Sequence, residues 1–199
     1  VCFDTETTSL DEMEAQIVGL AFSWEVHKGY YILFPEDFSL AKEWLSLLKP
    51  FFEAENILKI GQNLKYDLKI LANYDIEVRG QLFDTMIAHY LLNPDMRHNM
   101  DLLAEAYLSY APVAIETLIG KKGKGQLSMR SVPAELQKEY AVEDTDVTLQ
   151  LKHTFLPLLE KDKMTPLFTE VEAPLVRVLA QMEYEGIAVD TAFLSQLSK

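Results

Sequence analysis

The first eight residues constrain the fold most strongly, because they set two acids into an apolar run, Val-Cys-Phe-Asp-Thr-Glu-Thr-Thr. Side chains alternate between the two faces of a β-strand, so Asp4 and Glu6 would point the same way. Two carboxylates on one face repel, and at the end of a core strand a divalent cation is their usual compensation. A polar turn after a strand would explain this pair taken alone. A site for a hard ion such as Mg²⁺ or Mn²⁺ requires further lone acids elsewhere in the chain.

Composition narrows the class of protein. With 199 residues, 49% of them hydrophobic and 25% charged, the chain can bury one good core and an appendage. It has no apolar run of about 18 residues, so we expect no membrane-spanning helix. The single cysteine, Cys2, excludes an internal disulfide and fits a reducing compartment, expected to be the cytoplasm. The net charge of −13 argues against coating duplex nucleic acid, but allows a metal-filled cleft that holds a few nucleotides.

The apolar patterns predict an α/β fold that begins with an antiparallel meander. Residues 1–8, 17–24 and 29–34 have the pattern of three strands, and residues 57–61 that of a fourth. Helical spacing is found over residues 40–52, 64–71, 84–92, 100–108, 136–155 and 167–185.

Two of these helices carry apolar sets that we expect to be buried. Within 40–52 the set is Trp44, Leu45, Leu47 and Leu48, and within 167–185 it is Phe168, Val171, Leu175, Val178, Leu179 and Met182. Pro157 is expected to stop or kink the helix that begins near residue 136.

Asp67 is the third lone acid. It lies one turn into the helix that follows the strand 57–61, at the kind of strand-to-helix junction where sites of αβ folds gather. Asn63 is a natural cap for the start of this helix. A first-turn acid can also simply complement the helix dipole, and this alternative stays open for Asp67.

The fourth lone acid is Asp144, and a tyrosine lies close to it in the sequence. Tyr140 and Asp144 are four residues apart and share a helix face that Val147 continues into the core. A phenol and an acid are unusual neighbours for such an apolar face. Glu143 and Asp146 project elsewhere and are expected to be solvated.

Three further features have plain interpretations. Asp84 is expected mainly to cap the helix 84–92 and secondarily to support nearby site groups. His98 has no histidine or cysteine spaced for a zinc site. Residues 120–125, Gly-Lys-Lys-Gly-Lys-Gly, lack the Gly-Lys-Ser/Thr ending of a phosphate loop, and form either a flexible solvated loop or a mobile contact to phosphates.

In order and spacing, the motifs resemble those of the DEDD 3′-5′ exonucleases, in the subclass with tyrosine in the third motif. Asp4-Thr5-Glu6 resembles the first motif, residues 63–67 (Asn-Leu-Lys-Tyr-Asp) the second, and residues 140–144 (Tyr-Ala-Val-Glu-Asp) the third. The resemblance implies a ribonuclease H-like fold, with a mixed sheet of antiparallel meander plus parallel strands, flanked by helices and followed by a C-terminal helical segment.

A closer resemblance is to bacterial family A DNA polymerase I. It rests on residues 61–67, 83–86 and 140–151 and on the tail motifs Glu-Ala-Pro-Leu at 172–175, Met-Glu at 182–183 and Gly-Ile at 186–187. The resemblance implies an exonuclease domain over 1–163 and the opening segment of a truncated polymerase domain over 164–199. Relatives can place an aromatic before the basic loop to stack on the 3′ end, and here the nearest match is Ile115.

The resemblance also implies chemistry and partners. Asp4, Glu6, Asp67 and Asp144 would hold two Mg²⁺ or Mn²⁺ ions, and Tyr140 would orient the attacking water. Thr5, Leu10, Asn63 and Tyr66 would hold the single-stranded DNA 3′ end. A monomer with a covalently linked polymerase domain would release nucleoside 5′-monophosphates during proofreading.

Two alternatives remain at this point. A ribonuclease D-like RNA 3′-exonuclease would use the same acids. A non-catalytic single-strand-binding or scaffold domain could keep the acids without turnover.

Overall fold

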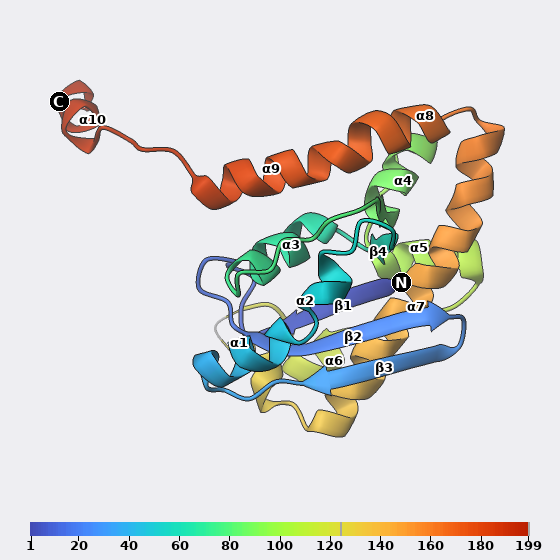
Figure 1. Cartoon of the computed structure of the whole chain (residues 1–199), viewed down its shortest axis with the longest axis horizontal. Coiled ribbons are helices and arrows are strands. Elements are labelled where there is room, and N and C mark those ends of the chain that lie inside the picture. The colour runs from blue at the N-terminus through green and yellow to red at the C-terminus, as the bar shows by residue number, and fades with distance from the viewer. Residues whose placement is uncertain (124, 199) are drawn as a thin grey trace.

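The computed structural model describes residues 1–123 and 125–198, and its centre is a mixed sheet of five strands (Figure 1). The strands are β1 Cys2–Thr7, β2 Ile17–Glu25, β3 Lys28–Leu33, β4 Lys59–Gly61 and β5 Leu82–Asp84. Their order in the sheet is β3-β2-β1-β4-β5. The first three strands form the expected antiparallel meander, whereas β4 and β5 run parallel to β1. This confirms the predicted fold class and adds β5, which the sequence pattern had placed at the start of a helix.

Helices flank the sheet and extend from it. They are α1 Phe38–Ser46, α2 Lys49–Phe52, α3 Leu64–Ala72, α4 Thr85–Leu92, α5 Met100–Leu108, α6 Glu116–Ile119, α7 Ala134–Lys161, α8 Thr165–Leu167, α9 Ala173–Glu185 and α10 Thr191–Leu197. A 3₁₀ turn spans Met129–Ser131, and a π-helical segment, Phe168–Glu172, joins α8 to α9. The long α7 packs against β1, β2 and β3, while α1, α2 and α3 lie on the opposite side of the sheet (Figure 1). Within the described residues, no helix has the length and hydrophobicity to span a bilayer.

The predicted helix 40–52 is two helices, and only part of its predicted inward face is buried. Pro50 lies in the first turn of α2 and cannot continue α1, so the chain restarts with a different phase. Trp44 and Leu47 are exposed, whereas Leu45 is buried and Leu48 is partly buried against the core. Phe52 fills the core instead, with its ring edge-on to Phe3 of β1 at a centroid distance of 5.2 Å.

The inward face predicted for residues 167–185 is also wrong, except for Phe168. Val171, Leu175, Val178, Leu179 and Met182 are at least partly exposed. The residues that α9 buries are small, namely Ala173, Val176 and Ala180. Small side chains let α9 lie close along α3, and this contact decides which side of the helix is covered.

Helix α7 continues through Pro157 to Lys161, so the expected stop at this proline is wrong. The proline removes one helical hydrogen bond near the end of the helix, while Phe155 and Leu159 stay buried on either side of it. Packing of these side chains therefore outweighs the local effect of the proline.

Candidate active site

Strand β1 and helix α7 bring three carboxylates together. Asp4, Glu6 and Asp144 each offer one oxygen, and these oxygens lie within 4.8 Å of one another. The pleat of β1 sends Asp4 and Glu6 toward α7, as predicted from their spacing. Glu6 Oε1 and Asp144 Oδ1 are buried and have no hydrogen-bond partner among residues 1–123 and 125–198. Buried carboxylate oxygens that lack donors are suited to a hard divalent cation.

The pKa values of the three carboxyl groups, Asp4, Glu6 and Asp144, are all raised. Burial, and next to it repulsion from Asp144, raises the pKa of Asp4 to about 8. The pKa of Asp144 is also raised to about 8 by burial, although the neighbouring Tyr140 hydroxyl acts in the opposite direction. Burial and the surrounding carboxylates raise the pKa of Glu6 well above its ordinary value. Each shift has the sign expected where positive charge is needed to keep several acids ionised.

Asp67 approaches the same place from α3, on the other side of β1. Its Oδ1 accepts hydrogen bonds from both the hydroxyl of Thr5, at 2.6 Å, and the Thr5 backbone N–H, at 3.0 Å. Burial and repulsion from Asp4 raise the pKa of Asp67, and the two Thr5 donors partly offset this rise. Asp67 is therefore held beside the three-carboxylate cluster by Thr5, with its second oxygen available for another contact.

Tyr140 lies one turn before Asp144 on α7 and is half-buried. Burial, followed by the charge of Asp144, raises the pKa of its phenol above the ordinary value. The phenol therefore remains protonated at neutral pH and can donate a hydrogen bond beside the acids.

Asp84 fixes the start of α3. Its carboxylate accepts from the backbone N–H of Asn63 at 3.2 Å and of Leu64 at 2.7 Å. It also accepts from the N–H of Met86 and of Ile87, so it caps α4 as predicted. Asn63 occupies the cap position of α3 in a left-handed conformation, φ 59°, but within the described structure its side chain makes no cap hydrogen bond. The expected Asn63 cap is thus replaced by Asp84, 21 residues away.

One pocket of about 470 Å³ collects every predicted site residue. Its lining includes Asp4, Thr5, Glu6, Leu10, Asn63, Tyr66, Asp67, Tyr140 and Asp144. Ile115 and Lys122 contribute to another part of the wall. Lys122 belongs to the basic loop 120–125, and of that loop Lys124 lies outside the described residues.

The structure adds residues that sequence reasoning missed. Glu143, expected to be solvated, accepts the hydroxyl of Tyr110 and the backbone N–H of Val113, the latter at 2.7 Å. It thereby ties the segment that leads to α6 onto α7. Asp146 likewise accepts from the N–H of His27 at 2.6 Å. Both partners are distant in sequence, at least 30 residues away, and no local pattern indicates them.

His98 is half-buried, and its Nδ1 lies 2.7 Å from Nδ1 of the buried His89. The structure thus gives His98 a partner that the sequence pattern did not indicate. On the other side of the His89 ring, the Tyr107 hydroxyl lies 3.1 Å from His89 Nε2.

Comparisons with known proteins give a consistent result. A family model described as 3′-5′ exonuclease matches residues 1–160. The chain is 37% identical to DNA polymerase I of Pseudomonas aeruginosa over 209 aligned residues, covering 100% of this chain and 23% of that protein. It is 36% identical to DNA polymerase I of Rhizobium leguminosarum, covering 100% of this chain and 22% of that protein. The chain thus spans less than a quarter of the length of these relatives.

Solved structures share the fold. The polymerase-domain structure of Pol1 from M. smegmatis, in complex with DNA primer-template and dNTP, superposes with a TM-score of 0.76 at 24% identity, covering 98% of this chain and 30% of that chain. NrnC of Brucella melitensis superposes with a TM-score of 0.72 at 20% identity, covering 93% of this chain and 84% of that chain.

Proposed function

Because the chain belongs to the 3′-5′ exonuclease family of bacterial DNA polymerase I, we propose that it removes nucleoside 5′-monophosphates from DNA 3′ ends as the proofreading part of a longer polymerase. The observation that carries this proposal is the group of three carboxylate oxygens within 4.8 Å of one another, from Asp4, Glu6 and Asp144. The match to residues 1–160 supports an exonuclease domain over 1–163, with 164–199 opening a polymerase domain.

The donor set fits two divalent ions, Mg²⁺ or Mn²⁺. Asp4, Glu6 and Asp144 would hold one, and Asp4 with Asp67 would serve the other. Bound there, such ions supply positive charge to the scissile phosphate and acidify the attacking water. The orphaned oxygens of Glu6 and Asp144 support this assignment.

The residues of the chain then have separate tasks. Tyr140 and Glu6 orient the attacking water, and because the phenol keeps its proton it positions this water without deprotonating it. Thr5 holds Asp67 in place. Leu10, Asn63 and Tyr66 line the pocket where the terminal nucleotides of a frayed strand would lie, and Lys122 can meet a phosphate there. A pocket of about 470 Å³ can take unstacked terminal nucleotides, which a frayed single strand presents and an intact duplex does not.

Substrate class is tested with two strands of equal sequence. 5′-Labelled single-stranded DNA and the matching RNA are incubated with the chain and Mn²⁺, and the lengths of the products are read on a denaturing gel. We expect a ladder that shortens the DNA from its 3′ end, release of nucleoside 5′-monophosphates, and no ladder in EDTA. Faster shortening of the RNA would favour the ribonuclease D-like alternative. Binding without shortening, at high enzyme, would favour the non-catalytic one.

A further inference from the structure

The loop between β1 and β2 forms one wall of the pocket, through Thr8, Ser9 and Leu10. Leu10 exposes 74% of its surface, so core packing does not fix its position. Inside the loop, the N–H of Asp11 donates to Ser9 Oγ and that of Met13 donates to Asp11 Oδ1. These short-range bonds shape the turn, but they do not place it relative to the rest of the pocket.

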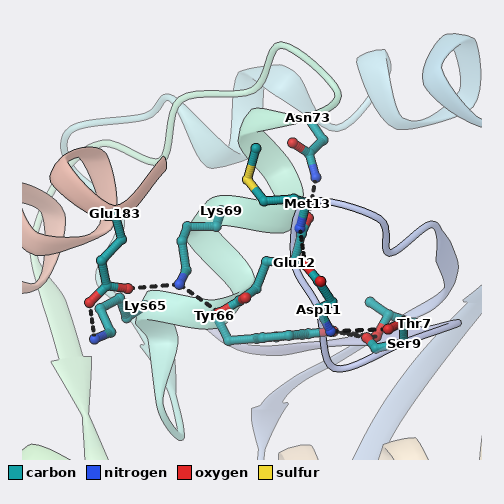
Figure 2. Close-up of polar contacts among 10 residues, drawn as sticks. All are labelled: Thr7, Ser9, Asp11, Glu12, Met13, Lys65, Tyr66, Lys69, Asn73 and Glu183. Atoms are coloured by element: carbon teal, nitrogen blue, oxygen red, sulfur yellow. Dashed lines mark hydrogen bonds and ion pairs between the residues drawn. The ribbon is translucent and has the colours of Figure 1, made fainter. Parts of the chain in front are cut away.

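Helix α3 holds this loop from one side (Figure 2). The hydroxyl of Tyr66 donates to the carbonyl of Ser9 at 2.6 Å and contacts the hydroxyl of Thr7. Asn73, just past the end of α3, donates to the carbonyl of Glu12 at 2.8 Å. Between them, Lys69 Nζ lies 2.6 Å from Glu12 Oε1. Residues 66, 69 and 73 share one face of the helix because they are three and seven positions apart.

Lys69 also contacts α9. Its Nζ lies 2.8 Å from Glu183 Oε2, while the other oxygen of Glu183 takes Lys65 Nζ at 2.6 Å (Figure 2). The Lys69 side chain is only 9% exposed, whereas Lys42, which pairs with Asp75 at the surface, exposes 38% of its side chain. A shielded ammonium between two carboxylates is screened much less than an exposed pair.

We propose that Lys69 is a positioning residue for the substrate 3′ end: through Glu12 it holds the loop that carries Leu10 against the pocket, and through Glu183 it couples that loop to α9. The proposal rests on the exonuclease function proposed above. It concerns ground-state placement of the terminal nucleotide, so it predicts an effect on KM with kcat unchanged.

The test compares Lys69→Met, which keeps the aliphatic stem, with Lys42→Met as a matched control. We expect Lys69→Met to raise KM for single-stranded DNA about fivefold, with kcat unchanged. Lys69→Arg should restore KM, and Glu12→Gln should raise it without adding to the effect of Lys69→Met. Glu183→Gln should raise KM less, because Glu12 still pairs with Lys69. An unchanged KM in Lys69→Met, an equal rise in Lys42→Met, or additive effects at Lys69 and Glu12 would overturn the proposal.

Hydrogen exchange separates this proposal from the activity itself. Lys69→Met should accelerate amide exchange of residues 9–14 relative to wild type and Lys42→Met, while exchange in β1 and α7 stays the same. This result is expected whether or not the chain degrades DNA. Unchanged exchange in the loop would contradict the positioning role even if the exonuclease is active.

Discussion

Thr5 and Asp67 are joined by two hydrogen bonds to one oxygen: Thr5 donates its hydroxyl to Asp67 Oδ1 at 2.6 Å and its backbone N–H at 3.0 Å. The pair connects β1 to α3 across the edge of the pocket. Asp4 and Glu6, the neighbours of Thr5, face the opposite way toward Asp144. Strand β1 thus lies at the centre of the four predicted acids. It carries Asp4 and Glu6, it holds Asp67 through Thr5, and it packs against α7, which carries Asp144.

The first prediction concerns this pair. Thr5→Val keeps the shape of the side chain but removes the hydroxyl donor, so Asp67 loses the shorter of its two bonds. We expect exonuclease activity to fall about 10- to 100-fold, as for other residues that orient metal-binding groups. Steady-state degradation of single-stranded DNA measures this. Thr154→Val, whose hydroxyl donates to a carbonyl of α7, is the control and should keep full activity; an equal loss there would refute a specific role for Thr5.

Stability should depend on pH and on metal together. Burial, followed by neighbouring carboxylates, raises the pKa of Asp4 and of Asp144 to about 8, so the folded chain binds protons more tightly than the unfolded chain. The contribution of the cluster to the free energy of unfolding is therefore greatest below about pH 4 and is lost as the pH rises to about 8. At the upper end, Mn²⁺ at about 100 times its Kd should raise Tm by about 5–10 °C.

Thermal denaturation at pH 5 and pH 8, with Mn²⁺ or EDTA, measures both effects. The doubly substituted variant Asp4→Asn, Asp144→Asn should lose most of the response to metal and most of the decline in Tm between the two pH values. A wild-type Tm that does not change on addition of millimolar Mn²⁺ at pH 8 would count against the proposed metal site.

Tyr140→Phe tests the positioning of water. The phenol is protonated at neutral pH, since burial and Asp144 raise its pKa above the ordinary value. Removal of one hydrogen bond in the reacting complex should lower kcat about tenfold and leave KM nearly unchanged. The wild-type rate should show no increase between pH 7 and pH 9 that comes from deprotonation of this tyrosine, and an increase that is absent in Tyr140→Phe would assign it as a base instead.

Asp84 should matter for stability. It accepts four backbone N–H groups at the starts of α3 and α4, and Asp84→Ala leaves these donors without a partner. We expect a loss of about 2–3 kcal/mol in the free energy of unfolding, read from the midpoint of urea denaturation. Asp84→Asn retains one acceptor oxygen and should lose less. Equal losses in the two variants would show that charge, and not capping, is the source of the effect.

Local patterns were sufficient for much of the site. The alternation of β1 predicts that Asp4 and Glu6 share a face, and the four-residue spacing of Tyr140 and Asp144 predicts one helix face. These relationships depend only on the geometry of a single element. That both elements meet at one pocket followed from the resemblance to a known family, because no local pattern specifies how β1 and α7 pack.

The sequence predictions fail where contacts between residues far apart in the chain determine the surroundings of a side chain. The partners of Glu143 and Asp146 were not indicated by the sequence, because Val113 and His27 lie 30 and 119 residues away. Val178 and Met182 repeat at helical spacing, but packing of α9 on α3 covers Ala173 and Ala180 instead. Apolar periodicity shows which residues share one face of a helix, but it does not show which element packs against the helix. Tertiary packing therefore decides which face is buried.

The measurement that tests the central claim most directly is Mn²⁺-dependent shortening of 5′-labelled single-stranded DNA by wild type, Asp144→Asn and Asp146→Asn. Asp146 lies on the same helix two residues further on, but it binds the N–H of His27 and does not line the pocket. We predict a ladder from the 3′ end for wild type and for Asp146→Asn, abolished by EDTA and by Asp144→Asn. Full activity of Asp144→Asn, or a ladder that persists in EDTA, would contradict a metal site built from Asp4, Glu6 and Asp144.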